Sequence, residues 1–105
     1  MIKALYAFTE NFAKEIAQTG HNIRTEDLSE IEKISGFMQS ANHIIDELNK
    51  IGQENLPGRT TNLVKINSDM MEMYDKGDAV GLADVMEYEL LNELEEVLYK
   101  LENAG

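Results

Sequence analysis

Apolar residues recur at steps of three and four along nearly all of this 105-residue chain. That spacing places them on one side of an α-helix, whereas a half-buried strand would alternate with a period of two. The first segment shows the pattern plainly, with apolar side chains at Ile2, Leu5, Phe8, Phe12 and Ile16. No stretch has the alternation of a strand. The sequence therefore predicts an all-α protein.

Glycines and capping residues divide the pattern into about four predicted helices, approximately over residues 2–19, 27–54, 60–76 and 78–102. Gly20 is expected to end the first helix, because glycine adopts the left-handed conformation that closes many helices. Asp27 and Glu30 have the spacing of a capping box at the start of the second helix. Gly36 lies inside this second helix, and we expect it to mark a close approach of two helices.

Stronger interruptions separate the later helices. Pro57 and Gly58 follow the second helix, because the residue before a proline is disfavoured in helical conformation. Gly77 is expected to end the third helix, and Asp78 to cap the fourth. The connection at Gly77 and Asp78 is so short that the last two helices must form a tight antiparallel hairpin or meet at a sharp corner. We expect an antiparallel helical bundle formed by a single domain over residues 1–105, either closed within one chain or completed by exchange of helices between two chains.

The charge and the hydropathy of the chain argue against two classes of partner, nucleic acids and membranes. Nine Lys and Arg residues face 20 Asp and Glu residues, a formal net charge of -11. Nucleic-acid binding needs a basic patch, so nucleic acid is not an expected partner. No apolar run approaches the roughly 18 residues of a membrane span, and the first residues lack the apolar core of a signal peptide. We expect a cytoplasmic protein with no membrane partner.

Few residues are suited to catalysis or metal binding. The chain has no cysteine, which excludes disulfides, zinc–thiolate sites and cysteine nucleophiles. Its two histidines, His21 and His43, have no serine and acid arranged as in a triad. A ferritin-like di-metal site needs glutamate three residues before histidine, but Gln18 and Ser40 stand there. Calcium loops and phosphate-binding glycine loops are also absent. We predict a protein that is not an enzyme and has no catalytic, cofactor or metal site.

The fourth predicted helix is both strongly apolar and strongly acidic. Residues 78–105 contain eight acidic residues and one lysine. Glu89, Glu93 and Glu96 lie at steps of four and three, so they share one side of a helix and repel one another. Two interpretations remain open: this acidic side is simply solvated, or it docks a basic partner.

Methionines concentrate in the third predicted helix, at positions 70, 71 and 73. Methionine fills irregular gaps in cores and also lines adaptable binding grooves. Helical spacing favours the core for most of this group. Met71 lies off the main apolar side and is the best candidate for an exposed contact.

Residues 77–91 read GDAVGLADVMEYELL. This segment resembles one in small, acidic, helical proteins of unknown function from Gram-positive bacteria, in which Asp-x-Val-x-Leu-Ala-Asp precedes an aliphatic residue and Leu-Glu-Tyr-Glu-Leu. Similar segments accompany motility-related proteins. Asn92 and Val97 depart from the proline and the aromatic residue found there. The resemblance covers only this part of the chain, and it implies a helical module that binds proteins or oligomerises and has no catalytic residues.

The apolar side of the fourth helix is wide enough to suggest an interface. Leu90, Leu91 and Leu94 are followed by Val97, Leu98 and Leu101, which span more than one narrow stripe. Exposed apolar patches usually mark interfaces. We expect a protein that acts through protein–protein contacts, most simply as a homodimer. The alternative is a small chaperone or adaptor that binds an amphipathic helix of a client, such as a motility or secretion protein. The candidate interface residues are Met71, Tyr88, Glu89, Leu91, Glu93, Glu96 and Leu98. We expect the Tyr88 ring to lie in a helix seam, and the alternative is a partner interface.

Overall fold

The computed structural model describes residues 2–24, 32–51 and 59–104, and these are helical almost throughout. The elements are α1 (Ile2–Arg24), α2 (Ile34–Ile51), α3 (Arg59–Lys76), α4 (Ala79–Asp84), the π-helical segment η2 (Val85–Leu90) and α5 (Leu91–Ala104). The last three follow one another without a break and form a single helical rod. The described residues contain no strand. The predicted all-α class is confirmed.

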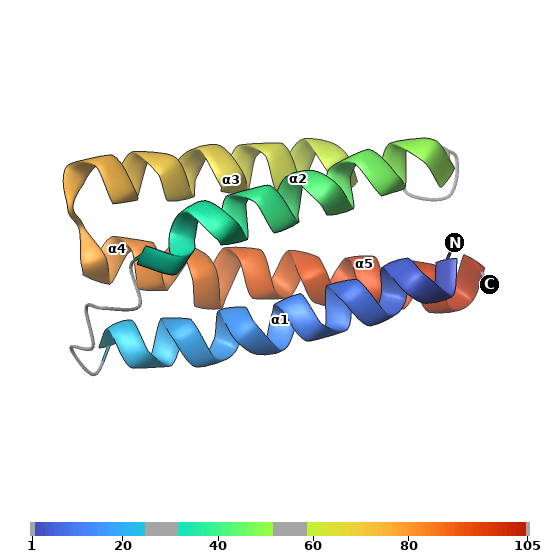
Figure 1. The fold of residues 1–105 in the computed structure, drawn as a ribbon, viewed down its shortest axis with the longest axis horizontal. Helices are drawn as coiled ribbons and strands as arrows, with labels where there is room; N and C mark the ends of the chain where they lie inside the picture. Colours follow the sequence, from blue (N-terminus) through green and yellow to red (C-terminus); the bar gives the residue numbers. More distant parts are fainter. Residues whose placement is uncertain (1, 25–31, 52–58, 105) are drawn as a thin grey trace.

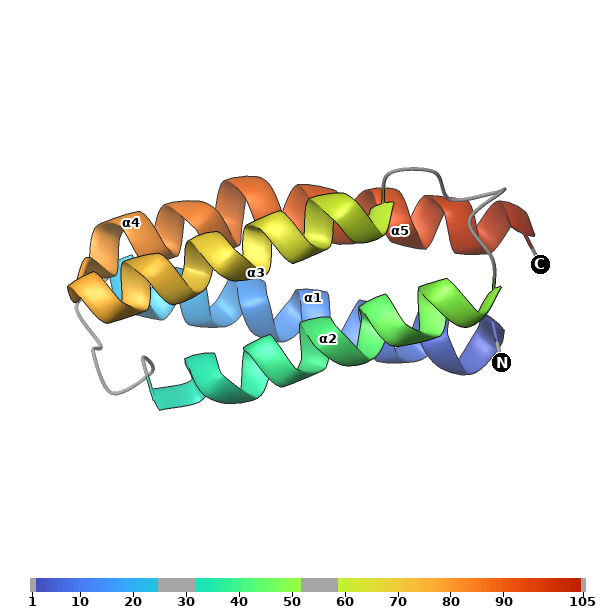
Figure 2. The same ribbon diagram turned by 90° about the horizontal axis from the view of Figure 1, so that it is seen from above.

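The four rods form an antiparallel bundle. Helices α2 and α3 make one layer, and α1 with α4, η2 and α5 makes the other (Figure 1). Seen from above, α3 lies beside the α4–α5 rod and α2 lies beside α1 (Figure 2). The two views together place α1 and α3 at opposite corners of the bundle. This arrangement confirms the predicted antiparallel helical bundle.

The core fills the space between the four rods. Each rod contributes apolar residues that are buried almost completely, and the largest of them are Ile16, Ile34, Ile44, Leu48, Leu63, Met70, Leu82, Met86, Leu90, Leu94 and Leu101. Phe12 of α1 packs against Phe37 of α2, with ring centroids 5.8 Å apart. Full burial of such side chains stabilises a fold by about 1.5–3 kcal/mol each, relative to leaving them exposed. Met70 is therefore a core residue, as its helical position predicts.

The third helix ends and the fourth begins as the sequence predicts. Gly77 has a φ of +69°. Its N–H donates to the Tyr74 carbonyl at 3.1 Å, and the Asp78 N–H donates to the Met73 carbonyl at 3.0 Å. This pair of bonds is the Schellman motif, which satisfies the last carbonyls of a helix. The Asp78 side chain then accepts from the Gly81 N–H at 2.9 Å and so caps α4.

Two expectations about glycine are wrong. Helix α1 does not end at Gly20 but continues to Arg24, because Ile23 extends its apolar side and is buried. Gly20 instead provides room for another rod, since a Cβ there would lie 2.8 Å from Glu87 Cγ. Gly36 does not mark a close helix approach, because a Cβ added to it would meet nothing within 4 Å.

The start of the second predicted helix lies partly outside the described residues. Asp27 and Glu30, the expected capping box, belong to that part of the chain, as do residues 52–54 at the expected end. The described α2 begins at Ile34 and reaches Ile51. The third predicted helix, residues 60–76, agrees with α3 to within one residue.

The fourth rod is interrupted by the π-helix η2, which the sequence interpretation missed. Leu82, Met86, Leu90 and Leu94 lie four residues apart and are all buried. Three turns of regular α-helix take about 11 residues, so these three steps contain one residue too many for a single face. The wider turn of η2 absorbs the extra residue and keeps Leu90 and Leu94 in the core.

Candidate protein interface

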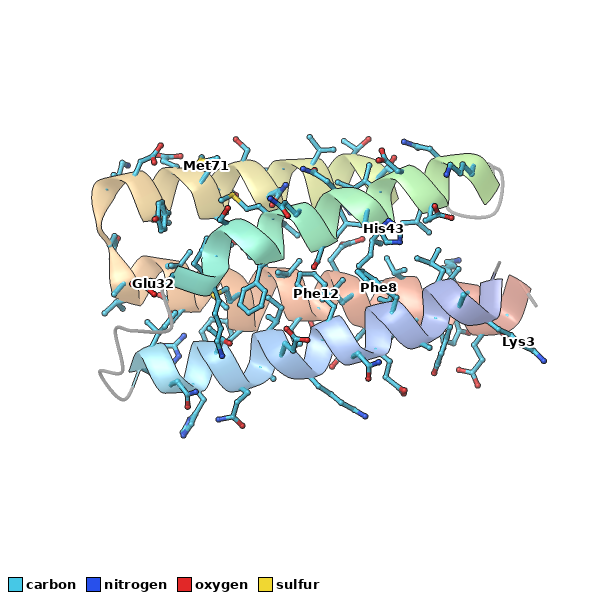
Figure 3. The ribbon with its side chains drawn as sticks, viewed as in Figure 1. Lys3, Phe8, Phe12, Glu32, His43 and Met71 are labelled. Carbon is cyan, nitrogen blue, oxygen red and sulfur yellow. The ribbon has the colours of Figure 1, made fainter. Side chains whose placement is uncertain are left out.

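An open groove of about 460 Å³ runs along the outer surface between α2 and α3. Its apolar lining is Met38 from α2 with Val64 and Met71 from α3. Val64 is 54% exposed and Met71 is 46% exposed, which is high for side chains of this kind. Figure 3 shows Met71 on the outer side of α3, away from the layer of α1 and α5. We call this surface the α2/α3 groove.

Uncharged polar side chains complete the lining of the α2/α3 groove. They are Ser35, Gln39, Asn42, Asn67 and Ser68. Across the groove, the Asn67 amide donates to the Asn42 side-chain oxygen at 3.2 Å, which ties the two helices together. None of the lining residues carries a charge at neutral pH. The groove is therefore a neutral surface on a strongly acidic protein.

The predicted interface residues do not form one surface. Met71 lines the α2/α3 groove, whereas the other six candidates belong to η2 and α5, and none of these lines the groove. Within that second group, Tyr88, Glu89 and Glu96 are exposed, and Leu91 and Leu98 are half-buried. Most of the wide apolar side of this rod is thus covered by the bundle itself.

Glu93 does not share the exposure of its neighbours Glu89 and Glu96. It is only 9% exposed, because its position between Leu90 and Leu94 brings it to the margin of the core, beneath α3. The Asn62 amide of α3 donates to Glu93 Oε2 at 3.3 Å. The acidic surface of α5 is therefore narrower than the sequence spacing suggests, and Glu93 is a contact between helices.

Tyr88 does not lie in a helix seam. Its side chain is 66% exposed, because it is two residues from each of the buried Met86 and Leu90 and so lies on the outer side of the rod. The guanidinium carbon of Arg24 lies 5.3 Å from the centroid of the Tyr88 ring, within the range of a cation–π contact. The expected helix seam is wrong, and one side of the ring is covered by Arg24.

Arg24 joins the end of α1 to the π-helix, a role that the sequence interpretation missed. Its Nη2 donates to Asp84 at 2.5 Å, and its Nε donates to Glu87 at 2.6 Å. The hydrogen bond to Asp84 raises the pKa of the Arg24 guanidinium above its usual value, and the hydrogen bond to Glu87 is the next largest contribution to this increase. Arginine suits this site, because its planar group can donate to two carboxylates at once.

His43 and Phe8 form a second contact between helices, on the face of α1 and α2. Their ring centroids lie 4.7 Å apart in an edge-on arrangement. Figure 3 shows the two rings approaching each other from the two layers. His43 is exposed rather than enclosed. The contact is a packing interaction at the edge of the core.

Two further findings concern ligands and membranes. In residues 2–24, 32–51 and 59–104, no group of three or more His, Asp or Glu side chains is placed to hold a metal ion. No helix in the described part of the chain has the length and apolar character needed to cross a membrane.

Comparison with known proteins gives a family and no function. No curated protein and no solved structure matches this chain. The match to a family model extends over residues 1–100, and so includes α1, α2, α3 and most of the fourth rod. The chain belongs to the family described as a domain of unknown function, DUF8042.

Proposed function

We propose that this chain is a non-enzymatic protein that acts through protein–protein contacts, and that it associates with itself through the α2/α3 groove. The observation that carries this proposal is the exposure of Val64 and Met71 on the same side of α3, next to Met38 across the groove. Apolar side chains gathered in this way lose contact with water when another protein covers them.

The chemistry of the groove supports binding rather than catalysis. Its lining consists of hydroxyl, amide, thioether and aliphatic side chains, and none of the lining residues is an acid or a base. General acid–base catalysis needs a titratable group within hydrogen-bond reach of the reacting atom. A neutral groove with flexible methionines fits a protein surface better than a reactive small molecule.

The proposed setting is the cytoplasm of a bacterium. The absence of cysteine is consistent with this compartment. The resemblance of residues 77–91 to proteins of Gram-positive bacteria supports the bacterial source. This segment contains the cap at Asp78 and all of η2, so we propose that it is the distinctive structural element of the family.

Sedimentation of the chain from low to high micromolar concentration tests self-association. We expect an increase from the monomer mass of 11.9 kDa to twice that value. Met71→Glu should keep the protein monomeric, because a carboxylate buried against Met38 and Val64 has no partner there. Tyr99→Glu is the matched control, since Tyr99 is also exposed but lies on α5. A chain that stays monomeric throughout contradicts self-association.

A client helix is the second candidate occupant of the groove. Met38 and Met71 line it, and their unbranched side chains adapt to the apolar side of an amphipathic helix. In this case the chain is an adaptor, and a motility-related client agrees with the resemblance of residues 77–91. A monomeric chain that captures one partner in equal amount, and loses it on Met71→Glu but not on Tyr99→Glu, supports the adaptor.

A further inference from the structure

The outer side of α3 has the spacing of a helix–helix seam. Val64, Ser68 and Met71 lie at steps of four and three, on a different side of the helix from the buried Leu63, Ile66 and Met70. Residues at this spacing form a line along one side of a helix, as in the seams of coiled coils. Ser68, in the middle of the line, is small enough to let another helix approach closely.

Two opposite charges lie beside this line, both along the same edge of it. Lys65 and Glu72 are both exposed and lie seven residues apart, which places them on the same side of the helix and about 10 Å apart along its axis. Lys65 makes no ion pair with any described residue. Glu72 accepts from Lys76 at 2.8 Å, and its carboxylate has further lone pairs for a second donor.

The arrangement of these four residues is self-complementary. The midpoint between Val64 and Met71 and the midpoint between Lys65 and Glu72 both fall within one residue of Ser68. A two-fold axis at Ser68 therefore brings Val64 of one copy to the level of Met71 of the other. It brings Lys65 to the level of Glu72 in the same way. A two-fold contact needs a surface of this kind, because the same patch serves both subunits.

We infer that the occupant of this surface is a second copy of the chain, docked with α3 antiparallel to α3 about a two-fold axis at Ser68. In this arrangement Lys65 meets the partner's Glu72, and Val64 meets the partner's Met71, at two equivalent places. A parallel arrangement would instead place like charges opposite each other. The inference rests on the proposed self-association and specifies its orientation and register.

The distribution of charge favours this face over the other helices. Helix α3 has three basic and three acidic residues, whereas the α4–α5 rod has seven acidic residues and one lysine. Contact through α3, a corner of the bundle, leaves the two acidic rods about two helix diameters apart, roughly 20 Å. This distance exceeds the screening length of about 8–10 Å at ordinary ionic strength, so their repulsion is largely screened. A dimer through α5 would bring the two acidic rods into contact.

Charge reversal at Lys65 and Glu72 tests the register. Lys65→Glu places two acids opposite each other at both sites, and Glu72→Lys does the same with two lysines. We expect each single variant to dimerise roughly tenfold more weakly than the wild type. An equimolar mixture of the two single variants restores both opposite-charge pairs, so it should form a heterodimer of near wild-type affinity. The combined variant Lys65→Glu/Glu72→Lys should also recover.

Controls separate the register from folding and from net charge. Circular dichroism at low concentration establishes that each variant is folded. Lys14→Glu and Glu10→Lys change the net charge equally on exposed positions of α1, so mixing these two variants should give no gain in affinity. If the wild type dimerises but the mixed Lys65 and Glu72 variants bind no better than each alone, the antiparallel register is wrong and self-association remains. A monomeric wild type overturns both proposals.

Discussion

Arg24 and Glu87 are 63 residues apart in sequence and are joined by a hydrogen bond of 2.6 Å. The bond fastens the last residue of α1 to the middle of the π-helix η2. π-Helical turns have poorer backbone geometry than α-helix and are rare, so they persist where surrounding contacts hold them. The Arg24 contacts with Asp84, Glu87 and Tyr88 supply such support at the surface of the bundle.

Replacement of Arg24 should loosen η2. We expect Arg24→Gln to lower the melting temperature by a few degrees and to speed amide exchange in Val85–Leu90. Arg24→Lys should lie between the wild type and Arg24→Gln, because one ammonium group cannot keep both planar contacts. Lys14→Gln, another exposed cation of α1, is the control and should leave exchange in η2 unchanged. Equal exchange rates in η2 for the wild type and Arg24→Gln would contradict this role.

Gly20→Ala should destabilise the fold, although alanine is the better helix former. The added Cβ would lie 2.8 Å from Glu87 Cγ, so Glu87 must move away from Arg24. We expect a net loss of about 1 kcal/mol in the free energy of unfolding, since the cost of crowding exceeds the gain in helix propensity. In a Glu87→Ala background the same change should become neutral or stabilising. Denaturant titrations of the four proteins measure this coupling, and additive effects would contradict it.

Gly36→Ala should have the opposite effect. A Cβ at Gly36 meets nothing within 4 Å, and its place in α2 gives alanine an advantage in helix propensity. We expect the free energy of unfolding to rise by about 0.5–1 kcal/mol. Urea denaturation of the single variant is sufficient to test this. A loss of stability would mean that Gly36 has a contact that its open surroundings do not show.

The pair of Glu72 and Lys76 should affect stability at acidic pH. The hydrogen bond from Lys76, followed by its charge, lowers the pKa of Glu72 below the usual 4.5. Because the pKa is lower in the folded state, the pair stabilises the fold above the unfolded pKa of about 4.5, and this contribution is lost as pH falls through the folded value. We expect Glu72→Gln to melt slightly below the wild type at neutral pH, with the difference vanishing at strongly acidic pH. Glu10→Gln is the control, and a difference that persists in acid would contradict the linkage.

Local signals in the sequence predicted the parts of the fold that depend on neighbouring residues. Gly77 and Asp78 form the end of α3 and the cap of α4 through bonds within five residues of one another. Helical spacing also predicted that Met70 is buried and that Met71 is exposed. These features need no knowledge of which helix lies opposite.

Features that depend on distant partners were missed or misplaced. Gly20 has the local signature of a helix end, but its actual role depends on Glu87 from another rod. Nothing near Arg24 in sequence indicates that it meets Asp84 and Glu87. Glu93 is covered because Asn62 of α3 lies above it, which the spacing of acids on a single helix does not reveal.

The π-helix differs from these cases, because the sequence did contain a signal for it. The apolar residues Leu82, Met86, Leu90 and Leu94 lie at three successive steps of four. A regular α-helix would need a step of three among them to stay on one side. The doubled apolar positions at 85–86 and 90–91 concealed the shift, because either member of each pair satisfied the expected period.

Deletion of one residue distinguishes a π-helix from a regular helix in the fourth rod. Removal of Glu89, which is exposed in η2, takes away the extra residue and allows a continuous α-helix with Leu90, Leu94 and Leu101 still facing the core. We expect this variant to unfold cooperatively with a modest loss of stability, because the contacts of Arg24 with η2 must rearrange. Removal of Glu95, exposed in the regular helix α5, rotates every later residue by about 100°, so Leu98 takes the buried place of Val97 and Glu102 takes the buried place of Leu101. The loss of the buried Leu101 side chain alone costs about 2–5 kcal/mol, and the charged Glu102 cannot replace it in the core. Thermal melts followed by circular dichroism compare the two deletions directly, and equal damage by both would contradict the role of η2 in setting the register of α5.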